Sequence, residues 1–150
     1  MRAFGKRFAK ADDGVAAIEF AVLGAVLCLI VVAVGDLGLG FYSDMQVQNS
    51  AQAGAQYAAV HGFNSTSISN AVTNATSVTG ITASPAPAQF CGCVTGTTMA
   101  TATCGTTCAN GMTAGTYVSV SAARTYSTLL SYPGFPASYS QAATSTVRIQ

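Results

Sequence analysis

An uninterrupted apolar stretch near the N-terminus constrains this chain more than any other feature. Between Phe20 and Gly35 no residue is charged or strongly polar, and after Asp36 the sequence is apolar again as far as Tyr42. Such a run is long enough to cross a hydrocarbon core of ~30 Å as an α-helix. A single segment can cross only as a helix, because every backbone N–H and C=O must find its partner within that segment. We therefore predict one membrane-spanning helix.

The few charged residues gather around this stretch and predict its orientation. They make up 7% of the 150 residues, and no acidic residue follows Asp44. Four of the six basic residues precede the span, namely Arg2, Lys6, Arg7 and Lys10. Lys and Arg beside a span stay in the cytoplasm, so the chain after the span is expected in a periplasm or outside the cell. Because no basic face follows the span, we do not expect nucleic-acid binding.

Glu19 interrupts the longer apolar segment from Gly14 to Tyr42, five residues after Gly14. A carboxylate within a span costs roughly a few kcal/mol and usually has a partner. The order of basic leader, Gly14, four apolar residues, Glu19, Phe20 and a long apolar run resembles the processing site of type IV prepilins. There the cut falls after the glycine, so Val15 becomes the new N-terminus, and Glu19 of one subunit can pair with the freed α-amine of its neighbour. The alternative is that Glu19 sits at the membrane edge and reaches water.

Residues 14–60 as a whole resemble the TadE-like pseudopilins, which are minor pilins of the tight-adherence (Flp, type IVb-like) pilus. The resemblance rests on Gly14 to Phe20, the span, Asp36 with a glycine two residues on, Phe41-Tyr42, and Gln48-Asn49-Ser50-Ala51 leading into an Ala-rich helix. The major Flp pilin usually has tyrosine where this chain has Phe20, and it is much shorter. Both departures favour a minor pilin.

The resemblance implies a structural role in pilus assembly and a set of partner proteins. A Flp-type prepilin peptidase would cut between Gly14 and Val15. Other pilin or pseudopilin subunits would dock through the N-terminal helix at Glu19 and Phe20. Membrane lipid and the inner-membrane pilus assembly machinery would be further partners. The chain would be a single-pass protein of the bacterial inner membrane, with its N-terminus cytoplasmic and its C-terminal domain periplasmic or carried into an extracellular pilus.

We predict three segments: a leader peptide at residues 1–14, a transmembrane and extended helix at 15–61, and a small α+β periplasmic domain at 62–150. The helix would be ~70 Å long at ~1.5 Å per residue. Gly35, Gly38 and Gly40 predict a kink or melted turn where it leaves the membrane. Gly62 is the expected helix stop.

The predicted domain packs a short helix on about four antiparallel strands. Apolar residues spaced at i, i+3, i+4 and i+7 predict a helix over residues 67–76, capped by Ser65 or Ser67. Strands are predicted over residues 77–84, 89–95, 116–128 and 140–149. Residues 96–114 are predicted to be a loop and residues 132–136 a turn.

Four cysteines, Cys91, Cys93, Cys104 and Cys108, cluster in this domain. A zinc site is the alternative, but C-x-C is not the usual zinc spacing and the compartment oxidises thiols, so we predict two disulfides and no metal. A Cys91–Cys93 bond is disfavoured, because alternate strand residues lie ~6.5 Å apart. Between the nested pairing (Cys91–Cys108 with Cys93–Cys104) and the crossed one, we favour the nested.

Catalysis and cofactor binding find no support in the sequence. The single histidine, His61, stands at a predicted helix end, and no carboxylate follows Asp44 to complete a catalytic set. Aromatic residues of the domain, Tyr117, Tyr126, Tyr132, Phe135 and Tyr139, form either an adhesive surface or parts of the core and strands. Two further interpretations stay open: an uncleaved single-span periplasmic anchor or adaptor, and a secreted domain, such as an adhesin, that loses the span.

Overall fold

The described chain has two helices followed by four strands, which is the α+β class predicted. The computed structural model describes residues 13–129, 134 and 136–150. Most of the predicted leader, and Tyr132 and Phe135 of the predicted turn, lie outside the described residues. The chain divides into two compact units, Met1–Leu39 and Gly40–Gln150.

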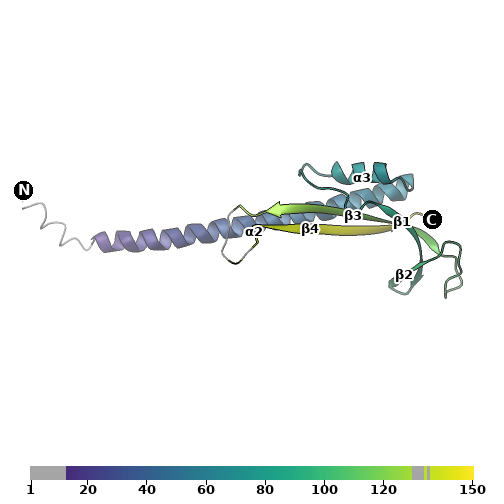
Figure 1. Cartoon of the computed structure of the whole chain (residues 1–150). Coiled ribbons are helices and arrows are strands. Elements are labelled where there is room, and N and C mark those ends of the chain that lie inside the picture. Colours follow the sequence, from purple (N-terminus) through teal and green to yellow (C-terminus); the bar gives the residue numbers. More distant parts are fainter. Residues whose placement is uncertain (1–12, 130–133, 135) are drawn as a thin grey trace, which may run out of the picture. The chain divides into compact units, whose positions relative to one another are not determined.

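Helix α2, Asp13–His61, is continuous over 49 residues (Figure 1). No turn melts at Gly35, Gly38 or Gly40, so the melted turn predicted there is wrong. Each glycine costs a helix only about 1 kcal/mol relative to alanine, which is too little to break a long run of good helix formers. Gly62 ends the helix as predicted: its φ is +78°, and its N–H donates to the Ala58 carbonyl at 2.9 Å.

The described part of the first unit is the apolar portion of α2. Large side chains are exposed on all its faces, with Phe20 78%, Val31 67% and Leu37 64% exposed. An 18-residue window of this helix reaches a mean hydropathy of 2.8, and none of that window is buried. This segment has no core of its own, so lipid or other helices must cover it.

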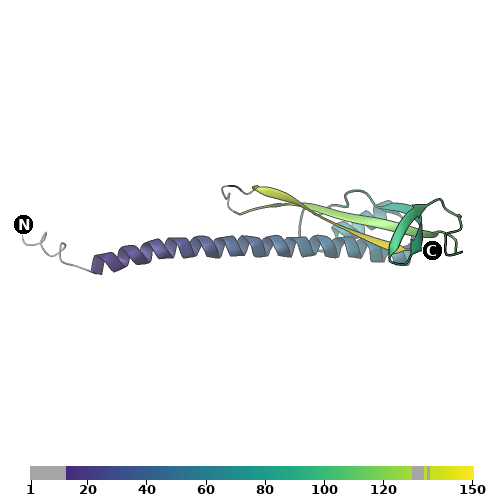
Figure 2. The same ribbon diagram turned by 90° about the horizontal axis from the view of Figure 1, so that it is seen from below.

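The second unit contains one antiparallel sheet of order β2-β1-β3-β4, seen from below in Figure 2. Its strands are β1 (Ala88–Thr95), β2 (Thr98–Ala102), β3 (Gly115–Ser127) and β4 (Ser138–Arg148). The β3–β4 ladder runs from Tyr117↔Arg148 to Ser127↔Ser138. The predicted strands at 89–95, 116–128 and 140–149 are therefore confirmed.

The strand predicted at residues 77–84 is wrong, because only Thr82 pairs, in an isolated bridge with Ala123. The fourth strand is instead β2, which lies within the predicted loop. Its sequence, Thr-Met-Ala-Thr-Ala, has a weak strand signal of its own. Its place comes from the hairpin with β1, in which Thr95 pairs with Thr98 and Cys91 with Ala102.

The core of the second unit forms where α2, the short helix α3 (Ser65–Thr73) and β3 meet (Figure 1). The fully buried residues include Val47, Ala51, Ala55 and Ala58 of α2, Ile68 and Val72 of α3, and Val118, Val120 and Ala122 of β3. Small residues on α2 allow α3 and β3 to pack close to its backbone. At Gly54, a Cβ atom would lie 2.5 Å from Val72 Cγ2 and 2.8 Å from Val120 Cγ1.

Helix α3 is capped by Asn64 and not by Ser65 or Ser67. Asn64 has extended dihedral angles, and its Oδ1 accepts a hydrogen bond from the Ser67 N–H at 2.9 Å. The helix begins at Ser65, two residues before the predicted start. Both serines are therefore inside the helix, where they cannot act as the N-cap.

Two disulfides are present as predicted, but their pairing is crossed: Cys91–Cys104 and Cys93–Cys108. The favoured nested pairing is therefore wrong, and the hairpin explains why. Cys91 stands opposite Ala102, so Cys104 follows just two residues beyond its partner position, with a Cα–Cα distance of 5.1 Å. The loop then returns to β1, where Asn110 Nδ2 donates to the Val94 carbonyl at 3.2 Å, and Cys108 reaches Cys93.

Candidate functional site

The predicted processing and docking residues occupy the first two turns of α2. Gly14, Val15, Glu19 and Phe20 are all exposed helical residues, and Val15 is 59% exposed. Val15 and Glu19 are four residues apart, so they share one face of the helix, about 6 Å apart along its axis. In the part of the chain that the structure describes, the Glu19 carboxylate has no hydrogen-bond or ion-pair partner.

The Glu19 carboxylate therefore lies near the N-terminal end of α2, and its neighbours along the helix are apolar. The next acidic residue along the helix, Asp36, is 4% exposed, whereas Glu19 is exposed. An exposed carboxylate on an apolar helix is costly in lipid unless a cation approaches it. The first turns of α2 can therefore attract a positive group from another molecule.

A buried polar cluster lies in the second unit, at its first helical turn, and sequence reasoning missed it. The Ser43 hydroxyl donates to Gln141 Oε1 at 2.6 Å and accepts from Arg124 Nη1 at 2.7 Å. Gln141 Nε2 donates to the Gly40 carbonyl at 2.8 Å. Ser43 and Gln141 are 2% and 5% exposed, so each buried polar group is satisfied by another. This cluster joins α2 to β3 and β4.

Two tyrosines close the same end of the sheet. The Tyr126 and Tyr139 rings lie 5.3 Å apart, and the Tyr139 hydroxyl occupies the place that a Cβ atom on Gly40 would need. Tyr126 and Tyr117 are buried, and the Tyr117 ring stacks on Phe90 at 5.8 Å. Tyr117 and Tyr126 are therefore strand and core residues and not an adhesive surface, whereas Tyr139 is 40% exposed. No signal in the sequence distinguishes Ser43 or Gln141 from the many other polar residues.

His61 is a surface residue of the last turn of α2. Its ring stacks on Tyr57 with the ring centres 4.3 Å apart, and its Nδ1 lies 3.2 Å from the Tyr57 carbonyl. Both contacts are local to the helix end, where a histidine interacts favourably with the terminal carbonyls. Within residues 13–129, 134 and 136–150, no group of three His, Cys, Asp or Glu side chains is placed to hold a metal.

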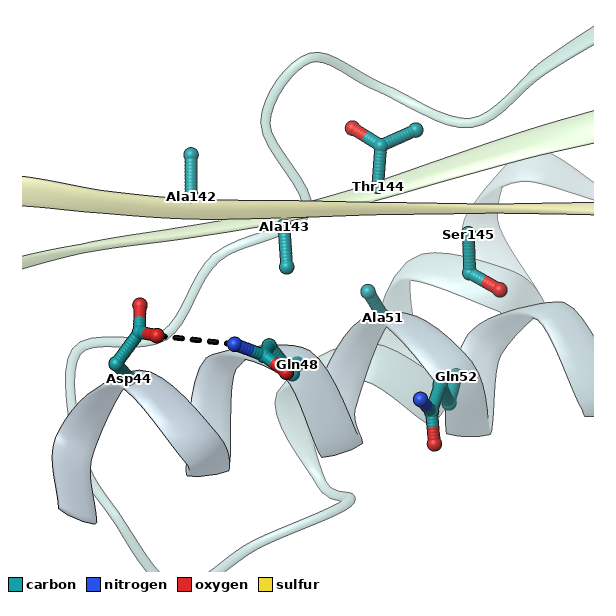
Figure 3. A pocket seen from close by; sticks show the side chains of 8 residues that line it. All are labelled: Asp44, Gln48, Ala51, Gln52, Ala142, Ala143, Thr144 and Ser145. Atoms are coloured by element: carbon teal, nitrogen blue, oxygen red, sulfur yellow. Dashed lines mark hydrogen bonds between the residues drawn. The ribbon is translucent and has the colours of Figure 1, made fainter. Parts of the chain in front are cut away.

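A groove of about 350 Å³ lies between α2 and the edge strand β4 (Figure 3). Asp44, Gln48 and Gln52 line it from the helix, and Ala143 and Ser145 point toward them from the strand. Asp44 Oδ2 accepts a hydrogen bond from Gln48 Nε2 at 2.9 Å. The lining is polar and small, with a single carboxylate.

Comparison with known protein families finds a match to the family described as TadE-like protein over residues 14–56. The matched segment starts at Gly14, covers the apolar part of α2 and extends into the part that packs in the second unit. The resemblance to TadE-like proteins predicted from the sequence is thus confirmed over this segment. No curated protein and no solved structure matches the chain.

Proposed function

We propose that this chain, which is TadE-like over residues 14–56, is a minor pilin or pseudopilin that serves a tight-adherence pilus as a structural subunit. The family match associates the chain with that pilus system, and the long apolar helix indicates single-pass membrane anchoring. The single observation that carries the proposal is the family match over residues 14–56, which starts in the first turn of α2 at Gly14 and covers its exposed apolar part.

The proposed processing step is hydrolysis of the Gly14–Val15 peptide bond by a prepilin peptidase. The basic residues of the leader would keep this bond on the cytoplasmic face. Cleavage there frees an α-amine on Val15 and removes the leader while the span is kept. The mature subunit would stay in the inner membrane until it assembles, with the second unit in the periplasm.

The proposed docking step uses Glu19 and the new N-terminus of a neighbouring subunit. Within one chain the rise from Val15 to Glu19 is about 6 Å, and the Val15 amine also belongs to the helix end. A neighbouring helix displaced along the axis can bring its own amine directly to the Glu19 carboxylate. An ion pair formed in an apolar surrounding offsets the cost of the buried charge only when both partners are present. The pair would therefore favour assembled subunits, with Phe20 adding apolar contact area.

Two variants separate processing from assembly in the bacterium that carries this pilus. Gly14→Leu should block cleavage, and the chain should keep its leader on a denaturing gel. Glu19→Gln should be cleaved like the wild type but should reduce sheared surface pili to background, measured by immunoblotting of the major pilin. Gln56→Glu, at an exposed position of α2 in the second unit, is the control for a change of charge and should leave both readouts unchanged. Wild-type levels of pili with Glu19→Gln would refute the docking role.

A further inference from the structure

The two edges of the sheet are protected to very different degrees. Strand β2, at one edge, is short (Thr98–Ala102) and stands between the cysteines of the disulfide-bonded loop. Strand β4, at the other edge, runs from Ser138 to Arg148, and among the described strands it pairs with β3 alone. An edge strand presents unpaired backbone N–H and C=O groups that can accept another strand.

Strand β4 lacks the devices that usually prevent such pairing. Its sequence, Ser-Tyr-Ser-Gln-Ala-Ala-Thr-Ser-Thr-Val-Arg, contains no proline and no lysine, and its single charge is at its last residue. Ala142, Thr144 and Thr146 alternate with the partly buried Ala143, Ser145 and Val147, which is the regular pattern of an unbulged strand. Proline, inward-pointing charge and bulges are the features that normally protect a long edge.

The groove beside β4 indicates what kind of strand would fit. A strand added to this edge would extend the sheet over Asp44, Gln48 and Gln52 of α2, where the groove now lies (Figure 3). Its inward side chains would meet two amides and one carboxylate rather than an apolar surface. The Asp44 carboxylate accepts a hydrogen bond from the neutral Gln48 amide, and no cationic side chain lines the groove among the described residues. Charge complementarity therefore favours a lysine or arginine on the inward face of the added strand.

We propose that β4 and the groove beneath it accept an extended, basic strand donated by a different polypeptide. This proposal does not depend on cleavage after Gly14. The described strands of this chain do not supply such a donor, because their only basic residues are Arg124 inside β3 and Arg148 at the last position of β4. The donor is therefore a different chain, which adds a strand by backbone hydrogen bonds.

The test uses the full chain extracted from membranes in detergent, with labelled peptides as probes. The first probe is Thr-Val-Thr-Lys-Thr-Lys-Thr-Val-Thr, in which Val and Lys share one face of the extended peptide. The second has Glu in place of both Lys, and the third has Pro in place of the central Thr. Binding is measured by fluorescence anisotropy. We expect the Lys probe to bind roughly tenfold more tightly than the Glu probe, and the Pro probe to bind least.

Adjacent residues of β4 supply a matched pair of variants. Ser145→Lys places an ammonium group in the groove beside the helix and should weaken binding of the Lys probe by roughly tenfold or more. Thr146→Lys adds the same charge on the outer face and should change binding by less than about twofold. Both variants should form the two disulfides and unfold at the wild-type temperature. Asp44→Asn, on the helix surface, should remove the preference for Lys over Glu and is informative even if Ser145→Lys misfolds.

Three results would overturn the proposal. The first is no saturable binding of the Lys probe to the wild-type chain. The second is equal binding of the Lys and Glu probes by the wild type, or an unchanged preference in Asp44→Asn. The third is a peptide-independent dimer that Ser145→Lys disrupts, which would assign the edge to a second copy of this chain.

Discussion

The two units of this chain obtain stability in opposite ways. The apolar helix from Gly14 to Leu39 exposes almost all its large side chains and makes no core of its own. The unit from Gly40 to Gln150 buries α2, α3 and β3 against one another and adds two disulfides. The same helix therefore changes role along its length. Its first part is apolar and exposed, as in a helix that crosses a membrane, and its later part is the central support of a folded domain.

Glycine substitutions in α2 should show the largest difference in stability between a change in one unit and a change in the other. Gly54→Leu inserts a side chain where even a Cβ atom would lie 2.5 Å from Val72 Cγ2. We expect it to destabilise the second unit by about 4 kcal/mol, which is at the upper end for overpacking. Gly38→Leu, at a position with nothing within 4 Å of a Cβ atom, should leave that stability unchanged. Thermal unfolding in detergent, followed by near-ultraviolet circular dichroism of the tyrosines, measures both.

Removal of one disulfide should have the next largest effect. Replacing Cys93 and Cys108 together with alanine should cost about 3 kcal/mol, since the bridge closes a loop of 15 residues. Cys28→Ala, in the exposed apolar helix, should not change the stability in the same assay.

The crossed pairing of the disulfides can be checked separately. In Cys91→Ala, thiol alkylation and peptide mapping should find Cys104 free, whereas a free Cys108 would contradict the crossed pairing.

The buried polar cluster should give a smaller loss. Gln141→Leu leaves the Gly40 carbonyl and the Ser43 hydroxyl without their buried partner and should cost about 2 kcal/mol. Gln56→Leu, at an exposed position of α2, is the matched control and should change stability by less than about 0.5 kcal/mol. Equal midpoints of urea unfolding for the two variants would show that the cluster does not stabilise the unit.

The cap of α3 should give the smallest effect. Asn64→Ala removes the acceptor of the Ser67 N–H and should cost about 1 kcal/mol. Ser65→Ala, one residue inside the helix, should be nearly neutral because the hydroxyl is not the cap. Urea unfolding distinguishes the two. A larger loss from Ser65→Ala than from Asn64→Ala would mean that the helix starts elsewhere.

The elements that were predicted correctly from the sequence are those marked by local signals. The apolar run and the absence of proline predicted α2, Gly62 predicted its end, and alternation near Tyr117 predicted β3. The errors arise where the fold is decided by partners distant in sequence. Residues 77–84 have the composition of a strand but pair only at Thr82, whereas β2 has a weak composition and is held by its hairpin with β1.

The site shows the same division. Gly14, Glu19 and the apolar run were visible as a motif, because the roles proposed for them depend on order along one helix. The Ser43–Gln141–Arg124 cluster was not visible, because its members are 98 and 81 residues apart in sequence and meet only when β3 and β4 pack on α2. The crossed disulfides likewise follow from the β1–β2 register, which four cysteine positions cannot determine.

The central claim is that the helix from residue 15 onward is retained for assembly while the leader is removed. The most direct test is the intact mass and N-terminal sequence of the chain extracted from membranes, expressed with and without its cognate prepilin peptidase. The account predicts a chain that starts at Val15 only when the peptidase is present, with the whole of the apolar helix retained. A chain that still starts at Met1 with active peptidase, or one that starts near residue 40 after loss of the span, would contradict it.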